Sequence, residues 1–175
     1  MINTTDSINI ITWNCNGFLS KSRQYELSDF VHNNDIHIVL LQETHVSNLS
    51  VGKRIEDFLK CKAIWNFGTF NSRGTAVLFF IDVNLQEFYL DREGRAMFVD
   101  FKYMDCEYRI INVYAPNIDE ERKLFFDDIV RHFSCRRPVI FAGDFNCIEK
   151  NYIDKIGGNP KRGLTGSLFL KKLMS

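Results

Sequence analysis

The sequence feature that most constrains the fold is the stretch Pro138–Cys147, which reads Pro-Val-Ile-Phe-Ala-Gly-Asp-Phe-Asn-Cys. Its first half is a short apolar run, which predicts a strand buried on both faces. The run stops at a glycine, and Asp144 and Asn146 follow. Side chains two positions apart on an extended chain point the same way, so these two can face one cavity while Phe145 packs behind them. The alternative is a turn in which Asp144 and Asn146 satisfy their own backbone.

The rest of the chain alternates between strand and helix patterns. Helices are expected over Lys21–Asn33, over Ser50–Lys60 and from a cap at Asn117 to about Phe133. The expected strands are Ile8–Trp13, Ile36–Leu41, Ala63–Phe67, Thr75–Ile81, Leu85–Leu90, Met97–Tyr103, Glu107–Tyr114 and Val139–Ala142. Two strand–helix–strand units flank a run of consecutive strands. This order predicts a mixed α/β fold with two sheets face to face and helices outside.

Three local patterns add detail to this prediction. Asn117, with Glu120 three residues later, is typical of a helix cap. The helix that follows should bury an apolar stripe, and its members are Phe125, Phe126, Ile129, Val130 and Phe133. In Met97–Tyr103, apolar residues alternate with Asp100 and Lys102, which predicts one wet face. After a loop with Gly157-Gly158-Asn159-Pro160, Leu164–Leu173 should begin a further helix.

Length and composition indicate an ordinary globular chain. With 175 residues, of which 45% are hydrophobic, one domain with a real core is expected over residues 8–175. The net charge is zero, so bulk charge does not announce a nucleic-acid binder. Residues 144–175 carry three acids and six bases, which fits either a solvated tail or a phosphate-facing rim.

The five cysteines and the N-terminal sequence bear on the compartment. Five is an odd number, and no Cys-x-x-Cys pair occurs, so reduced thiols in an intracellular protein are expected. No basic segment followed by an apolar run opens the chain, and no apolar run is long enough to span a bilayer. We therefore expect a protein that is not secreted and has no membrane partner.

Polar residues collect where the apolar strands end. They are Asn14 and Asn16, Glu43, Asn112 and Tyr114, and Asp144 and Asn146. The carboxyl ends of strands are where sites form in α/β sheets. Carboxylates with amides make an oxygen-rich, open site that suits Mg²⁺ better than zinc, and no His or Cys cluster has zinc spacing. Taken one by one, the two N-terminal asparagines could be turn residues, Glu43 a cap and Tyr114 a core aromatic.

Six segments of the sequence form a recognisable set, namely Ile11–Gly17, Leu41–His45, Ser72–Leu78, Glu93–Arg95, Asn112–Asn117 and Gly143–Asn146. In these segments the chain resembles the endonuclease/exonuclease/phosphatase superfamily, and most of all the apurinic-type endonuclease domain at the N-terminus of LINE-type (non-LTR) retrotransposon proteins. The resemblance implies a four-layer α/β sandwich, a divalent metal and a DNA substrate.

The resemblance also implies roles for the matching positions. Glu43 would hold the metal, usually Mg²⁺ with Mn²⁺ as an alternative, and Asn14 would help to order its water or the phosphate. Tyr114 would contact the scissile phosphate. Asp144 would orient or deprotonate the attacking water, and Asn146 would fix the phosphate and the nucleophile. Two further positions are ambiguous: Asn16 stands where repair-type relatives often have Asp, and His45 would support Glu43 or lie on the surface.

The family continues past this length with further strands and a Ser-Asp-His segment, which this sequence lacks. We therefore expect the fold to be incomplete at its C-terminus and the chain to be weakly active or inactive, since losing an acid–base group typically costs about 10²–10⁴ in rate. Three functions stay open: a Mg²⁺-dependent DNA-nicking phosphodiesterase, a non-catalytic remnant of a mobile element, and a phosphatase or phosphodiesterase acting on another substrate. We expect the protein to be nuclear only if it is part of an active retrotransposon.

Overall fold

A computed structural model of the chain describes residues 7–69 and 71–147. The expected loop Gly157–Pro160, the expected helix Leu164–Leu173 and most of the basic C-terminal region lie outside the described residues. Within them, eight strands form two four-stranded sheets, and three α-helices and one short 3₁₀ helix connect them.

The first sheet has the order β1-β2-β4-β3. Its strands are β1 (Ile10–Asn14), β2 (Ile38–Gln42), β3 (Lys62–Asn66) and β4 (Thr75–Phe79). β1 and β2 are parallel, with Asn14 opposite Gln42, whereas β4 is antiparallel to both its neighbours. The central pair is buried throughout, since every residue of β2 and β4 is buried.

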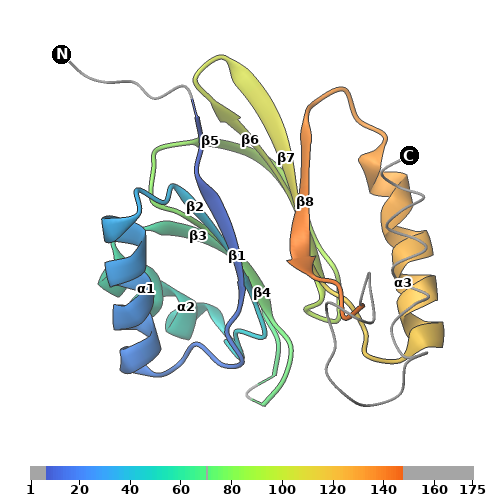
Figure 1. Cartoon of the computed structure of the whole chain (residues 1–175), viewed down its shortest axis with the longest axis horizontal. Coiled ribbons are helices and arrows are strands. Elements are labelled where there is room, and N and C mark those ends of the chain that lie inside the picture. Colours follow the sequence, from blue (N-terminus) through green and yellow to red (C-terminus); the bar gives the residue numbers. More distant parts are fainter. Residues whose placement is uncertain (1–6, 70, 148–175) are drawn as a thin grey trace, which may run out of the picture.

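Two helices connect strands of this sheet and cover its outer face (Figure 1). They are α1 (Lys21–Asn33) and α2 (Leu49–Leu59). The Ser20 side chain caps α1 by accepting from the Arg23 N–H, and Asn48 caps α2 by accepting from the Val51 N–H. Such caps satisfy amide groups that the first helical turn leaves unpaired.

The second sheet has the order β5-β6-β7-β8. Its strands are β5 (Asn84–Leu90), β6 (Ala96–Tyr103), β7 (Cys106–Tyr114) and β8 (Val139–Asp144). The first three are antiparallel neighbours, and β8 joins β7 in parallel, so that Tyr114 lies opposite Asp144. Between β7 and β8 the chain forms α3 (Asp119–Val130) and η1 (Arg131–Phe133), which lie outside this sheet (Figure 1).

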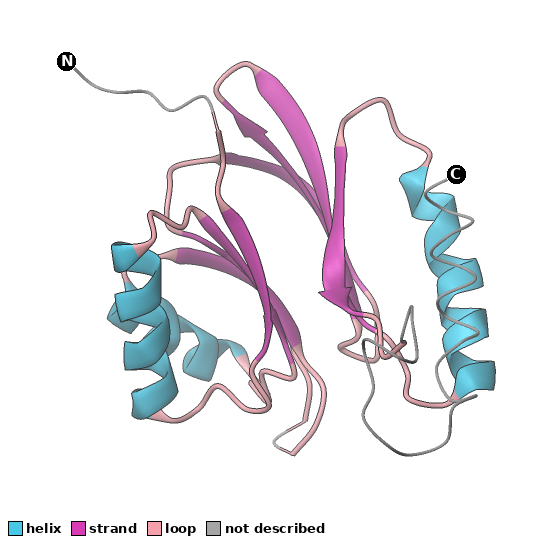
Figure 2. Ribbon diagram, in the orientation of Figure 1, coloured by secondary structure: helices cyan, strands magenta, loops and turns pink. Residues whose placement is uncertain are grey.

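The two sheets pack face to face, with the helices on the two outer sides (Figure 2). Apolar side chains of β2 and β4 meet those of β6 and β7 in the central core. Its fully buried members are Ile38, Leu40, Val77, Phe79, Met97, Val99, Phe101 and Ile110. This is the four-layer α/β sandwich that was expected from the sequence. No helix among the described residues has the length and hydropathy needed to cross a membrane.

The start of α3 corrects one prediction. The N-cap position is Ile118, no side chain caps the helix, and Asn117 lies before it. The buried guanidinium of Arg122 instead donates to the carbonyl oxygens of Pro116 (2.9 Å) and Asn117 (3.1 Å) and pairs with Asp119. The turn that enters the helix is thus fixed from inside by Arg122. This residue also replaces Val130, which is 39% exposed, on the buried face of the helix.

Two strand predictions are also wrong. Asp100 on β6 does not face water: it is 2% exposed because the guanidinium groups of Arg109 and Arg137 pair with its carboxylate. The expected strand Val139–Ala142 was predicted to be buried on both faces, but all six residues of β8 are only partly buried. Within the described part of the chain it pairs with β7 alone, so one edge of the strand has no neighbouring strand to cover it.

Candidate active site

Four strands end at the same place in the structure. The parallel pairs β1–β2 and β7–β8 bring their carboxyl ends together within each sheet, and the face-to-face packing brings the two pairs to one end of the sandwich. Asn14, Tyr114 and Asp144 are the last residues of β1, β7 and β8, and Glu43 follows β2 directly. The sequence therefore positions these side chains through strand length and strand direction alone.

Asn14 joins the two carboxylates of the site. Its Nδ2 atom donates to Glu43 Oε1 and to Asp144 Oδ2, both at 2.7 Å. Its Oδ1 atom accepts from the Asn16 backbone N–H at 3.1 Å. Arg23 fastens the same turn by donating to the carbonyl oxygen of Asn16 at 2.8 Å. Asn14 is thus a turn residue and a site residue at once, whereas Asn16 contributes backbone groups to these contacts.

Asp144 and Asn146 likewise form a local turn and face the site, the two alternatives that their sequence left open. Asp144 Oδ1 accepts from the Asn146 backbone N–H at 3.0 Å, which is the local turn, while Oδ2 faces Asn14. The Asn146 amide donates to the Ala115 carbonyl oxygen at 2.7 Å, which holds its side chain against the end of β7. Phe145 packs away from the site, 4.9 Å from the ring centroid of Phe141.

The hydroxyl group of Tyr114 lies beside the carboxylates. Burial raises its pKa to about 12, together with hydrogen bonding to Glu43 and the negative charges of Glu43 and Asp144, while the positive charge of Arg95 acts in the opposite direction. The phenol therefore stays protonated at neutral pH and is a hydrogen-bond donor in the site. Its ring lies under the Arg95 guanidinium, with Arg95 Cζ 5.1 Å from the ring centroid.

The backbone around the site is strained. Four non-glycine residues here have positive φ, at 42° for Asn16, 53° for Glu43, 56° for His45 and 47° for Asn146. Asparagine and histidine are enriched in this region, but at Glu43 the conformation costs on the order of 1–3 kcal/mol. Strain of this kind persists where surrounding contacts impose it and commonly marks functional sites. At Glu43 it aims the carboxylate into the site.

The donor set fits a hard divalent cation. Glu43 and Asp144 offer carboxylate oxygens, and amides and a phenol surround them, which is the oxygen-rich chemistry that Mg²⁺ takes. His45 Nε2 is buried, lies 3.9 Å from Glu43 Oε2 and lacks a hydrogen-bond partner among the described residues. His45 is thus a partly buried neighbour of Glu43, with 15% of its side chain exposed. No group of three or more His, Cys, Asp or Glu side chains with metal-binding geometry occurs in the described ranges.

Asn112 does not reach the site. It is fully buried between the sheets, where its amide donates to the carbonyl oxygens of Leu41 (3.0 Å) and Ala76 (2.9 Å). Its own Oδ1 accepts from Gln42 Nε2 at 2.7 Å. Asn112 therefore pins the second sheet to the first just below the carboxylates. The sequence could not distinguish this role from a catalytic one, because both place an amide near a strand end.

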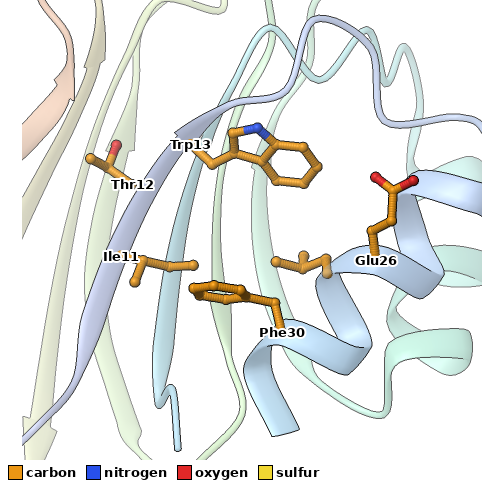
Figure 3. Close-up of a pocket in the computed structure, with 6 residues that line it drawn as sticks. Ile11, Thr12, Trp13, Glu26 and Phe30 are labelled. Carbon is orange, nitrogen blue, oxygen red and sulfur yellow. The ribbon is translucent and has the colours of Figure 1, made fainter. Parts of the chain in front are cut away.

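A separate cavity of about 400 Å³ lies between β1 and α1. Figure 3 shows Ile11 and Trp13 pointing toward the helix, which contributes Phe30, with Glu26 at the margin, whereas Thr12 points the other way. The lining is largely apolar and lacks the carboxylates and amides of the site at the strand ends. We assign no function to this cavity.

Comparison with protein families identifies the class. The family model described as "Endonuclease/Exonuclease/phosphatase family" matches residues 11–158. This range includes all four strand ends of the site. The chain belongs to the endonuclease/exonuclease/phosphatase family.

Two relatives are similar to the chain at nearly equal identity. One is an exodeoxyribonuclease of Bacillus subtilis, 26% identical over 170 residues, which cover 87% of this chain and 62% of that protein. The other is an uncharacterized 149 kDa protein of transposon TX1 from Xenopus laevis, 27% identical over 148 residues, which cover 80% of this chain and 11% of that protein. The chain thus spans less than two thirds of either relative. A mobile-element protein and a bacterial exonuclease are equally similar to it.

The fold is shared with solved structures. A 3′ phosphatase from Neisseria, bound to a product DNA hairpin, superposes with a TM-score of 0.75 over 96% of this chain and 70% of that one, at 18% identity. At this identity the likeness establishes the fold and nothing finer. It agrees with the two-sheet sandwich described above.

Proposed function

We propose that the chain is a divalent-metal-dependent phosphodiesterase domain that cleaves DNA. The observation that carries this proposal is the contact of Asn14 with both Glu43 and Asp144, because it joins the ends of three strands from two sheets into one acidic, oxygen-rich site. Membership of the endonuclease/exonuclease/phosphatase family supports the same chemistry. The proposal concerns the domain, since the chain spans only part of its relatives.

The side chains divide the work of hydrolysis. Asp144 orients a water molecule and takes one of its protons as the water oxygen bonds to phosphorus. The P–O3′ bond breaks, and the leaving oxygen is protonated by solvent. Tyr114, which stays protonated, donates a hydrogen bond to a phosphate oxygen, and Asn146 holds the phosphate and the water in line.

Glu43 would hold Mg²⁺ or Mn²⁺, and Asn14 would join it if the Asn14 side chain rotated to present its oxygen. The charge of the metal would stabilise the phosphate and the leaving oxygen. Asn14 Nδ2 lies between the carboxylates of Glu43 and Asp144 and donates to both. It therefore holds them near each other while reducing their electrostatic repulsion. Glu43 contributes one negative charge, and position 16 is an asparagine and not an acid. These residues favour weak binding of a metal ion that keeps several of its water ligands.

DNA nicking by a retrotransposon-type endonuclease is the particular activity we favour, supported by the transposon TX1 relative and by the segment Asn112–Asn117. A 3′ phosphatase is the second candidate, supported by the similar structure from Neisseria. The two differ in what they need, because an endonuclease cuts within a strand and a 3′ phosphatase needs a strand end.

Closed circular DNA separates these candidates, because it has no ends. We expect the chain at high concentration with Mg²⁺ to convert supercoiled plasmid slowly to the open circle, and EDTA to stop the conversion. The comparison substrate is an oligonucleotide with a 3′ phosphate, and release of inorganic phosphate is measured.

The pattern of plasmid nicking, phosphate release and metal binding decides between the candidate functions. Phosphate release without plasmid nicking favours the second candidate. If neither substrate reacts, and Mn²⁺ titrated into the chain gives no binding heat that Glu43→Gln removes, the metal-dependent phosphodiesterase proposal is wrong and the remnant interpretation stands.

A further inference from the structure

Arg95 holds Tyr114 from three sides. The Tyr114 N–H donates to the Arg95 carbonyl oxygen at 2.7 Å, and Arg95 Nη1 donates to the Tyr114 carbonyl oxygen at 3.3 Å. The guanidinium also covers the ring, with Cζ 5.1 Å from its centroid. A single residue thus fixes both backbone groups and one face of the side chain that carries the hydroxyl group of the site.

Arg95 is itself held in place. Its side chain is only 15% exposed, and its Nε lies 3.6 Å from the Glu93 carboxylate, which also pairs with Arg73 at 3.3 Å. Asp91 Oδ1 accepts from the backbone N–H groups of Arg95 (2.8 Å) and Ala96 (3.0 Å). Asp91 thus fixes the backbone of Arg95, while the guanidinium contacts both the Glu93 carboxylate and the Tyr114 carbonyl oxygen, which a lysine ammonium with its single nitrogen would not reproduce.

The Arg95 turn is also tied to the segment that carries Glu43. The Gly74 N–H donates to the Gly94 carbonyl oxygen, and the Gly74 carbonyl oxygen accepts from the Thr44 N–H, both at 3.0 Å. Backbone hydrogen bonds therefore connect the Arg95 turn both to Tyr114 and to Thr44, the residue directly after Glu43.

We propose that Arg95 is a positioning residue that acts through Tyr114: it sets the direction of the phenol hydroxyl relative to Glu43 and so to the bound phosphate. This inference rests on the proposed function. It differs from direct phosphate binding by Arg95, in which a positive charge alone would be enough and Tyr114 would be irrelevant.

The first measurement needs no activity. In protein labelled with ¹³C at the tyrosine ζ carbon, the Tyr114 signal is identified by its loss in Tyr114→Phe. We expect Arg95→Lys to shift or broaden this signal and to leave the other tyrosine signals in place. Arg92→Lys is the matched control, because Arg92 is exposed on the same turn, and it should change nothing.

The second measurement is a double-mutant cycle on cleavage of a phosphodiester substrate. Arg95→Lys should lower kcat roughly 10- to 100-fold with little change in KM, as is usual for residues that orient a functional group. In the Tyr114→Phe background the same substitution should cost about 2-fold or less, because the hydroxyl group that it positions is gone. Unfolding in urea checks that each variant is folded.

The outcomes separate the inference from the proposed function. An unchanged Tyr114 signal, an equal loss in both backgrounds, or full activity of Arg95→Lys overturns the role of Arg95 while the proposed function stands. If the unsubstituted chain cleaves neither DNA substrate and also shows no Mn²⁺ binding that depends on Glu43, the proposed function is overturned, and the Tyr114 signal then still decides whether Arg95 positions the phenol.

Discussion

Asn14 donates a 2.7 Å hydrogen bond to Asp144, which lies 130 positions away in the sequence. The bond crosses from the end of β1 in one sheet to the end of β8 in the other. Because the same Nδ2 atom also donates to Glu43, the orientation of one amide determines the spacing of both carboxylates. This contact brings the polar ends of the two sheets together into one candidate site.

Asn14→Asp should weaken the fold without metal and strengthen metal binding. The substitution places three carboxylates together and removes the donor between Glu43 and Asp144, so we expect a loss of about 1–3 kcal/mol in unfolding free energy in EDTA. Saturating Mn²⁺ should restore more stability to this variant than to the unsubstituted chain. Asn71→Asp, on an exposed turn, is the control and should respond to neither condition. Equal stabilisation of Asn14→Asp and of the unsubstituted chain by Mn²⁺ would contradict the prediction.

Gly143→Ala should be strongly destabilising. Gly143 has a φ of 139°, and a Cβ atom there would lie 2.0 Å from the Val113 carbonyl oxygen, which is backbone of the neighbouring strand. Conformational strain and overpacking together should cost about 3 kcal/mol or more in urea-induced unfolding at pH 7. A variant that unfolds at the same urea concentration as the original chain would show that β8 does not approach β7 this closely.

Asp100 should make stability depend on acid pH. Burial raises the pKa of this carboxyl, but hydrogen bonds and positive charge from Arg109 and Arg137 outweigh burial and hold the pKa below its usual range. A carboxylate with a lowered folded pKa stabilises the fold above its unfolded pKa of about 3.9 and loses that contribution as the pH falls through the folded value. Unfolding free energies at pH 7, 5 and 3 should therefore fall most steeply below pH 4.

Asp100→Asn tests the same point at neutral pH. It leaves Arg109 and Arg137 without their buried partner and should cost about 3–5 kcal/mol at pH 7, while its stability should fall less than that of the original chain below pH 4. Asp105→Asn, at a fully exposed carboxylate, should match the original chain at every pH. Parallel acid profiles for all three chains would rule out Asp100 as the source.

Asn112→Ala should loosen the contact between the two sheets. It removes the donor to the Leu41 and Ala76 carbonyl oxygens and leaves Gln42 Nε2 without one acceptor, all in the buried region between the sheets. Unsatisfied buried groups cost about 1–3 kcal/mol each, so we expect a loss of roughly 3 kcal/mol. Amide exchange should speed up in β2, β4 and β7. Unchanged exchange in these strands would contradict the prediction.

The sequence was informative where local patterns decide the structure. Lys21–Asn33 is a helix with the predicted bounds, and β6 and β7 end at Tyr103 and Tyr114 as expected. Direction and periodicity also placed Asn14, Glu43, Tyr114 and Asp144 at strand ends. That these strand ends could meet was inferred from their shared polar character, but which strands are neighbours came only from the structure, because no local pattern contains that information.

Predictions failed where a partner outside the local sequence pattern decides the environment. Asp100 alternates with apolar residues as a solvent-facing residue would, but its carboxylate is buried and paired with Arg109 on the neighbouring strand and with Arg137. Asn117 has the spacing of a cap, yet Arg122 holds the turn from the core. Arg95 stood in a matching segment without a role, because its contact with Tyr114 depends on strand pairing that the sequence does not display.

The measurement that tests the account most directly is the rate of plasmid nicking by three variants under single-turnover conditions with Mg²⁺. Glu43→Gln and Asp144→Asn should each lower the rate by about 10²–10⁴ relative to the chain itself, and Asp105→Asn should leave it unchanged. Nicking that persists undiminished in Glu43→Gln or Asp144→Asn would show that the strand ends do not form the catalytic site.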